Sequence, residues 1–238
     1  MSRLLVPLAL VGLTGCFVQL HQDDGIDAIE EPFSRVVVEV ETGSVEIYGG
    51  SSDITEVDWD MRWGMGCPEV DSYVWDETLY IVGECPKGGF GCSTDFRITV
   101  PSGVDIEARI VTGELVAEDV GSVTAELTTG ELQVFQAEGD IDLEVTTGSI
   151  IAQDLRSERV RAELTTGSMD LMLDSEFAEV EADLVTGDIT LAVPEGCYDL
   201  DLDVVTGDVE SWGVGCDCSA EGSIHARVVT GSILVRGE

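Results

Sequence analysis

The chain has 238 residues, 48 of them acidic and only 11 basic, so its formal net charge at pH 7 is −37. A field of this sign repels nucleic acid and anionic lipid headgroups, and it argues against a nucleic-acid partner. Hydrophobic residues nevertheless make up 44% of the chain and recur regularly, so we expect a folded body and not a disordered polyanion.

The first 16 residues predict export followed by attachment to lipid. Arg3 precedes a short apolar run, which is typical of a secretory signal and too short to span a bilayer. The run ends in Leu13-Thr14-Gly15-Cys16, which resembles the bacterial lipobox and implies that the Cys16 thiol carries diacylglycerol. Two or three acyl chains would anchor the protein stably, because each buried methylene contributes about 0.8 kcal/mol. Phe17 follows the cysteine in place of the Asp that retains many lipoproteins at the inner membrane, which favours the outer membrane or cell surface.

Two segments separate this anchor from the regular part of the chain. Residues 17–34 are polar and lack periodicity, so we expect a tether. Residues 35–101 predict an irregular β module that contains most of the aromatic side chains, with a turn at Trp75-Asp76-Glu77-Thr78.

Residues 102–238 are built from a short repeat. Including one earlier copy, eight Thr-Gly pairs occur within residues 35–238, and the steps from Gly113 onward are 17, 18, 19, 20, 20 and 24 residues. Aliphatic residues or Ala occupy the positions seven, five and three before each Gly, as in Val123, Ala125 and Leu127. An aliphatic residue or Met returns two residues after it, which is the period-two pattern of strands with one apolar face. The glycines are Gly43, Gly113, Gly130, Gly148, Gly167, Gly187, Gly207 and Gly231.

Two architectures fit this pattern. Each Thr-Gly could begin a hairpin turn in an antiparallel meander, or it could be the corner of a coil in a β-solenoid. A meander would leave a one-sided apolar sheet with no helix to cover it, whereas stacked coils enclose their own interior. We therefore predict an all-β protein, a β-solenoid of 17–24-residue coils preceded by the irregular β module. The corners are expected to be structural, because Gly permits a tight bend and stacked Thr hydroxyls can share hydrogen bonds.

The repeated "VTGD", "TTGS" and "VTGE" corners and the segment "ITVPSGVDIEARIVTGELV" (98–116) resemble the bacterial putative-adhesin family, a head-GIN-like β-strand-repeat domain of unknown function. The resemblance covers residues 35–238. It implies a right-handed β-helix-like fold on an exported or membrane-attached protein, and it brings no catalytic residues to transfer.

Six cysteines remain in the mature chain, and in an exported protein an even number predicts disulfides. They form two groups of three, so either one bridge links the groups or some thiols stay free. Fifteen pairings are possible, and a metal site at Cys216 and Cys218 is the alternative. The candidates are Cys67, Cys85, Cys92, Cys197, Cys216 and Cys218.

One outward row of the predicted coils is acidic. If coils stack about 4.8 Å apart, its carboxylates form a ladder with Arg109 and Arg227 at either end. Like charges at that spacing repel, so the row is either solvated and screened by salt or bridged by weakly bound Ca²⁺. We name Glu126, Glu144, Glu163, Asp183 and Asp203 the acidic row.

The aromatic module is the better candidate for recognition, with Trp59, Trp63, Trp75 and Phe90 as candidates for contact with a glycan or an envelope protein, although aromatic side chains on one strand face more often pack in the core. Core packing is the alternative role for side chains that share one strand face. Support for catalysis is thin, because the only histidines are His21 and His225 and no nucleophile or phosphate-loop motif occurs.

These features predict a noncatalytic, lipid-anchored module of the cell envelope with a structural, adhesive or sensory role. The alternative is a surface lyase or glycosidase acting on polysaccharide, for which Arg109, Arg161 and Arg227 are the basic residues near the acids. Apart from the weak calcium, no cofactor is expected.

Overall fold

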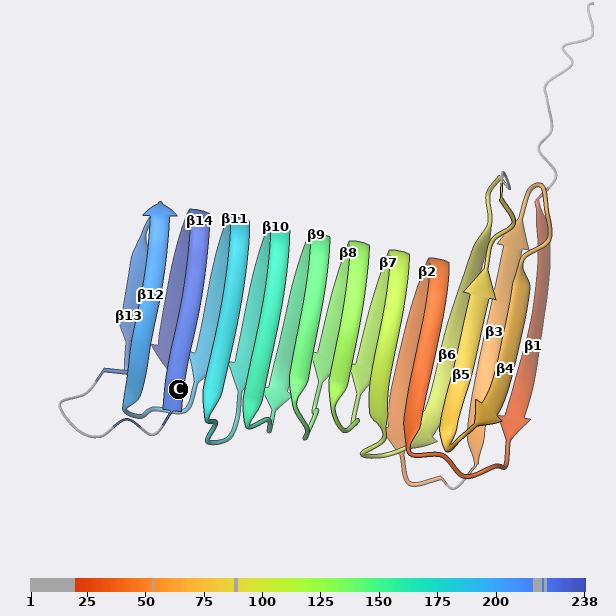
Figure 1. Cartoon of the computed structure of the whole chain (residues 1–238), viewed down its shortest axis with the longest axis horizontal. Helices are drawn as coiled ribbons and strands as arrows, with labels where there is room; N and C mark the ends of the chain where they lie inside the picture. Colours follow the sequence, from red (N-terminus) through yellow and green to blue (C-terminus); the bar gives the residue numbers. More distant parts are fainter. Residues whose placement is uncertain (1–19, 53, 88–89, 216–219, 221) are drawn as a thin grey trace, which may run out of the picture.

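The computed structural model describes residues 20–52, 54–87, 90–215, 220 and 222–238. The predicted signal peptide and Cys16 lie outside these residues. All regular secondary structure in the described part of the chain is β, and fourteen strands form one mostly parallel sheet (Figure 1). Within the same residues, no helix is long and apolar enough to cross a membrane.

The strands have the following bounds: β1 His21–Ile29, β2 Arg35–Gly50, β3 Thr55–Trp63, β4 Glu69–Trp75, β5 Thr78–Glu84, β6 Ser93–Pro101, β7 Asp105–Glu118, β8 Val123–Phe135, β9 Ile141–Leu155, β10 Arg159–Leu173, β11 Glu179–Val193, β12 Tyr198–Thr206, β13 Val209–Trp212 and β14 Gly222–Gly237.

The repeated strands lie side by side and parallel, which excludes the antiparallel meander. Their order is β2-β7-β8-β9-β10-β11-β14-β12, and every neighbouring pair is in register at the Thr of the Thr-Gly corner. We call the residues before each corner Gly the first leg of a strand and those after it the second leg. The apolar positions of both legs are buried in one continuous core in β2, β7 to β11 and β14, as the alternation predicts, whereas those of β12 are only partly buried and Val209 on β13 is exposed.

Close approach of backbones explains why each corner needs Gly. The eight corner glycines have φ between 137° and 155°, a region that side chains disfavour. A Cβ on Gly148 would lie 1.6 Å from the carbonyl oxygen of Gly130, and a Cβ on Gly167 would lie 1.6 Å from that of Gly148. The corners are therefore structural, and any side chain there would separate two strands.

At two places among the repeated strands, neighbours in the sheet are not consecutive in the chain. β2 lies against β7, so Gly43 stacks on Gly113 although 70 residues separate them (113 − 43). At the other end β14 lies between β11 and β12. Stacking in sequence order would place Asp183 opposite Asp203, whereas the insertion places Arg227 between them. Charge pairing is the physical reason that we assign to the inserted order.

At the N-terminal end the sheet turns antiparallel and covers the core. β5 pairs with the first leg of β2, and β4 pairs with β5. β6 pairs with the second leg of β2, β3 pairs with β6, and β1 pairs with β3. The Ser72 hydroxyl on β4 donates a 2.7 Å hydrogen bond to Asp27 on β1. Phe33, Trp59 and Val70 pack against the core from this end.

Strand β1 lies in the segment that the sequence predicts to be a tether. Most of its side chains are exposed and only Ile29 is buried, so the apolar alternation that reveals a strand is missing. Backbone pairing with β3 holds it instead, and the ring of Trp59 lies over Gly25, where a Cβ would come within 2.3 Å of a ring carbon. The predicted turn is confirmed: Asp76 and Glu77 have φ of 50° and 58° and join β4 to β5.

Candidate functional site

A shallow, open groove on the outer surface lies at the N-terminal end and crosses β1, β3, β6 and β2. Two rows of side chains come together there through strand pairing: Asp24 lies opposite Asp60 and Asp60 opposite Asp95, while Ile26 lies opposite Asp58 and Asp58 opposite Arg97. The hollow has a volume of about 470 Å³. We call it the N-terminal groove, and its lining residues are Asp24, Gly25, Ile26, Ser44, Glu46, Asp58, Trp59, Asp60, Asp95, Phe96 and Arg97.

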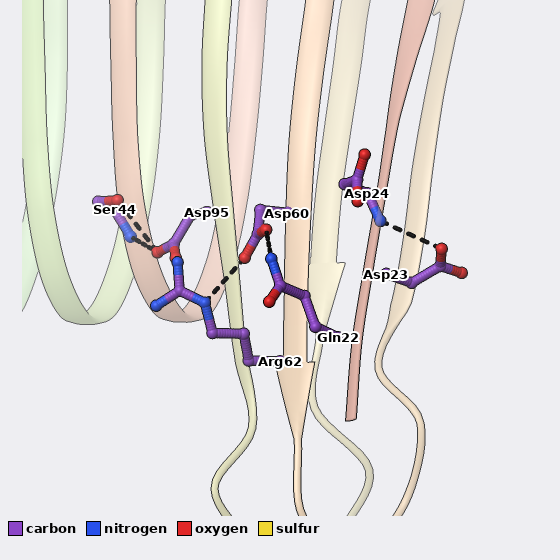
Figure 2. Close-up of polar contacts among 7 residues, drawn as sticks. All are labelled: Gln22, Asp23, Asp24, Ser44, Asp60, Arg62 and Asp95. Carbon is purple, nitrogen blue, oxygen red and sulfur yellow. Dashed lines mark hydrogen bonds and ion pairs between the residues drawn. The ribbon is translucent and has the colours of Figure 1, made fainter. Parts of the chain in front are cut away.

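Arginine and amide side chains order part of this acidic surface (Figure 2). Arg62 lies 2.9 Å from an oxygen of Asp60 and 3.4 Å from one of Asp95, so one guanidinium bridges β3 and β6. Gln22 donates a 2.6 Å hydrogen bond to Asp60 from β1. Ser44 donates to Asp95 through its backbone N–H at 2.8 Å and its hydroxyl at 3.0 Å. Contacts from β1, β2 and β3 thus hold the carboxylates of Asp60 and Asp95 in fixed positions.

The second row of the groove contains another charge-assisted pair. Arg97 donates to Glu46 through two nitrogens, at 2.9 and 2.6 Å. The Tyr48 hydroxyl lies 3.2 Å from the same Glu46 carboxylate, and burial together with this negative charge raises the pKa of Tyr48. Carboxylates and guanidinium groups on an open surface can accept and donate hydrogen bonds to hydroxyl-rich or cationic ligands. Sequence reasoning missed this surface, because the antiparallel pairing that assembles it leaves no motif.

The four aromatic candidates do not form one site. Trp59 packs on the core and over Gly25, and the Trp63 ring stacks on that of His21 with centroids 5.6 Å apart. Trp75 is 67% exposed and Phe90 is 60% exposed. Trp75 pairs with Thr78 at the start of β5, whereas Phe90 follows the other end of that strand. Two exposed aromatics therefore remain for recognition, at separate places.

The acidic row is assembled, but its order differs from the prediction. Glu126, Glu144, Glu163 and Asp183 lie on four successive strands. Arg227 then separates Asp183 from Asp203, so it does not end the row as predicted. Only four carboxylates are adjacent.

Ion pairs relieve much of the repulsion in and beside the row. The Arg109 guanidinium lies 3.0 Å from Glu126 and 3.9 Å from Glu39. Its hydrogen bond and charge lower the pKa of the Glu126 carboxyl against the opposing effect of burial. Arg161 lies 3.9 Å from Asp142 and pairs with Glu163 on its own strand. Arginines placed between carboxylates of adjacent strands thus compensate part of the negative charge in and beside the row.

The described residues contain no group of three or more His, Cys, Asp or Glu side chains arranged to hold a metal ion. His225 lies opposite Glu181 and Asp201, and its Nδ1 is 3.7 Å from the Asp201 carboxylate. The other histidine, His21, stacks on Trp63.

The first group of cysteines yields one disulfide and one free thiol. Cys85 and Cys92 are bonded with Cα atoms 6.0 Å apart, and they close the loop between β5 and β6. β5 and β6 pair with the two legs of β2, so the loop between them takes the place that a Thr-Gly corner has in the repeated strands. Cys67 is exposed and free, which is the alternative in which some thiols of a group of three stay unpaired.

The second group lies largely beyond the described residues. Cys197 is disulfide-bonded. Cys216 and Cys218, the other two candidates, fall outside the described residues.

Comparison with known proteins gives structural likenesses only. No family model and no curated protein matches the chain. A putative cell adhesion protein from Clostridium sporogenes is 13% identical with a TM-score of 0.40, and the match covers 92% of this chain and 100% of that one. A putative adhesin from Bacteroides fragilis is 14% identical with a TM-score of 0.40 over 92% and 97%. A putative adhesin from Parabacteroides distasonis is 12% identical with a TM-score of 0.42 over 91% and 97%. Likenesses at this level carry no conclusion about function.

Proposed function

We propose that the protein is a noncatalytic, lipid-anchored β-solenoid of the bacterial cell envelope that acts as an adhesive or structural surface module. The observation that carries the proposal is the repetition of outward side chains in register along the parallel strands. The residue before each corner Thr is an exposed Val or Thr from β7 onward, as in Val111, Thr146 and Val185. Rows of this kind give repeat proteins extended surfaces for interaction.

Attachment to the membrane follows from the lipobox-like end of the signal. We expect the full chain made in a bacterial host to fractionate with membranes and to carry acyl chains on Cys16, measured by intact mass. Cys16→Ser should remain unacylated and leave the membrane fraction. An unacylated wild-type chain, recovered without membranes, would contradict the anchor.

Adhesion without turnover is the test of the central role. The full chain in detergent should be retained on a glycan array while leaving the retained oligosaccharides uncleaved after prolonged incubation. Trp75→Ala should weaken retention, and Trp212→Ala, an exposed tryptophan at the opposite end of the sheet, is the matched control. Cleavage that is lost on single carboxylate substitutions would overturn the noncatalytic role in favour of a polysaccharide-active enzyme.

Stabilisation by cations is a secondary part of the proposal. Four adjacent carboxylates on successive strands favour weak association with Ca²⁺ at the surface. Millimolar calcium should raise the melting temperature modestly, and more than the same ionic strength of sodium chloride. An unchanged melting temperature would remove this part.

A further inference from the structure

The C-terminal end of the sheet has a free edge. Strand β12 is the last strand of the order, and in the described part of the chain no strand pairs with its outer side (Figure 1). Backbone N–H and C=O groups along such an edge can pair with another chain. We call the outer side of β12 over residues 199–206 the free edge.

The core is incompletely covered at this edge. Leu200, Leu202 and Val204 are the inward residues of β12, and all three are only partly buried. Their counterparts two strands inward, Val180, Ala182 and Leu184, are no more than 2% exposed. Another strand with apolar inward residues would therefore remove further apolar surface from water.

Outward side chains of the free edge are acidic. Asp199, Asp201 and Asp203 alternate with the three inward residues. On the covered side of β12, the strand β14 meets them with Ser223, His225 and Arg227. The Asp201 carboxylate lies 3.7 Å from His225, and that of Asp203 lies 4.0 Å from Arg227. β14 thus shows within the molecule which kind of strand β12 accepts: apolar inside and basic outside.

We propose that the free edge binds an extended segment of a partner protein by parallel strand addition, and that this segment alternates apolar with basic residues. The inference rests on the proposed interaction role and names the class of partner. A second copy of this chain is opposed by a net charge of −37. The sheet edges at its other end are acidic as well, with Asp23 and Asp24 on β1 and Asp71 on β4. Charge complementarity therefore selects a basic strand from another protein.

The sequence of β14 itself is the probe. A labelled synthetic peptide of residues 222–237 should bind the full chain in detergent, measured by fluorescence anisotropy. The same peptide with His225→Glu and Arg227→Glu keeps the apolar alternation and should bind at least tenfold more weakly. Amide NMR shifts on binding should concentrate in β12.

Variants of the chain distinguish the contribution of the free edge to peptide binding from that of the overall negative charge. Asp199→Asn, Asp201→Asn and Asp203→Asn together should weaken peptide binding at least tenfold. The matched control, Glu144→Gln, Asp174→Asn and Glu176→Gln, removes the same charge from exposed positions elsewhere and should bind within twofold of wild type.

Three results would overturn the proposal. They are the absence of peptide binding at millimolar concentration, equal binding of the charge-reversed peptide, and concentration-dependent dimerisation of the chain through β12. None of these bears on glycan retention, which is measured without peptide, so the adhesive role and the strand-binding edge fail or survive separately.

Discussion

In the middle of the sheet and at its N-terminal end, pairs of legs are joined in two different ways. Between β7 and β11 each corner is a Gly whose position is fixed by the carbonyl of the preceding Gly. At the N-terminal end the legs are the separate strands β5 and β6, and a loop closed by Cys85–Cys92 replaces the corner. Gly43 stacks there on the backbone of Thr94, where a Cβ would lie 2.0 Å from the Thr94 oxygen.

The difference shows how a repeat is ended. Identical corners allow each strand to be covered by its neighbour, but a terminal strand has no neighbour of the same kind. At the N-terminal end antiparallel strands, a disulfide and the Trp59 ring cover the core. At the C-terminal end of the described residues the last strand of the sheet is β12, with partly buried apolar residues, a row of aspartates and the disulfide-bonded Cys197 directly before it. Substitutions in the middle should therefore cost more than the same substitutions at the C-terminal end.

The largest expected effect is at a corner in the middle. Gly148→Ala would place a Cβ 1.6 Å from the Gly130 oxygen, so two backbones must separate. We expect the free energy of unfolding to fall by more than about 4 kcal/mol, measured by chemical denaturation of the full chain. Gly103→Ala is the control, because Gly103 also has positive φ but nothing lies within 4 Å of the added Cβ, and it should cost about 1 kcal/mol. Equal costs would show that close stacking does not define the corners.

The next largest effect is expected from Leu→Ala substitutions, which compare core packing in the middle of the sheet with core packing at its C-terminal end. Leu143 is fully buried on β9, whereas Leu202 is partly buried on β12. Leu143→Ala should lower the free energy of unfolding by roughly 3 kcal/mol, and Leu202→Ala by about 1 kcal/mol. A loss at Leu202 as large as that at Leu143 would mean that the free edge is covered in the full chain, which would also count against strand addition.

Removal of the Cys85–Cys92 disulfide tests how much this bond stabilises the N-terminal end. Cys85→Ser with Cys92→Ser opens a loop whose ends are 7 residues apart, and should cost roughly 2.5 kcal/mol. Dithiothreitol also reduces the disulfide of Cys197, so it should destabilise the wild-type chain more than the double variant, and the difference should match the cost of the Cys85–Cys92 bond. Cys67→Ser should be neutral, because this thiol is exposed and free. If Cys67→Ser matched the double variant, the assigned pairing would be wrong.

The smallest effect concerns charge in the acidic row. Glu126 is held by Arg109, which lowers its pKa, whereas Glu144 lies between two carboxylates and has no ion-pair partner among the described residues. Because the folded-state pKa of Glu126 is depressed, its stabilisation is present above the unfolded value of about 4.3 and is lost as pH falls through the folded value. At pH 7, Glu126→Gln should lower the melting temperature by at most a few degrees, and Glu144→Gln should leave it unchanged or raise it slightly.

The pH dependence of the melting temperature tests the direction of this effect. The difference between wild type and Glu126→Gln should shrink on acidification below the ordinary glutamate pKa. A difference that grows as the pH falls would contradict the role assigned to Arg109.

The repeated strands could be predicted from the sequence and the ends could not. Period-two alternation around each Thr-Gly pair identifies the buried residues of β7 to β11, because one face of every strand is covered. The same rule fails for β1, whose side chains are mostly exposed and which is held by its backbone. The placement of β14 between β11 and β12 depends on which charges meet across strands, and spacing along the chain does not record that. The N-terminal groove was missed for a similar reason, since Asp60 and Asp95 come together only through antiparallel pairing.

The position of Arg227 between Asp183 and Asp203 and the free edge both depend on the order β11-β14-β12, so this order is the central claim. Methyl-labelled NMR of the full chain tests it directly through the interior residues Leu184, Val228 and Val204, which occupy one row. We predict strong cross-peaks from Val228 to both Leu184 and Val204, and a weaker or absent cross-peak between Leu184 and Val204, which lie two strands apart. A Leu184–Val204 cross-peak stronger than either Val228 cross-peak would show stacking in sequence order and contradict the structure.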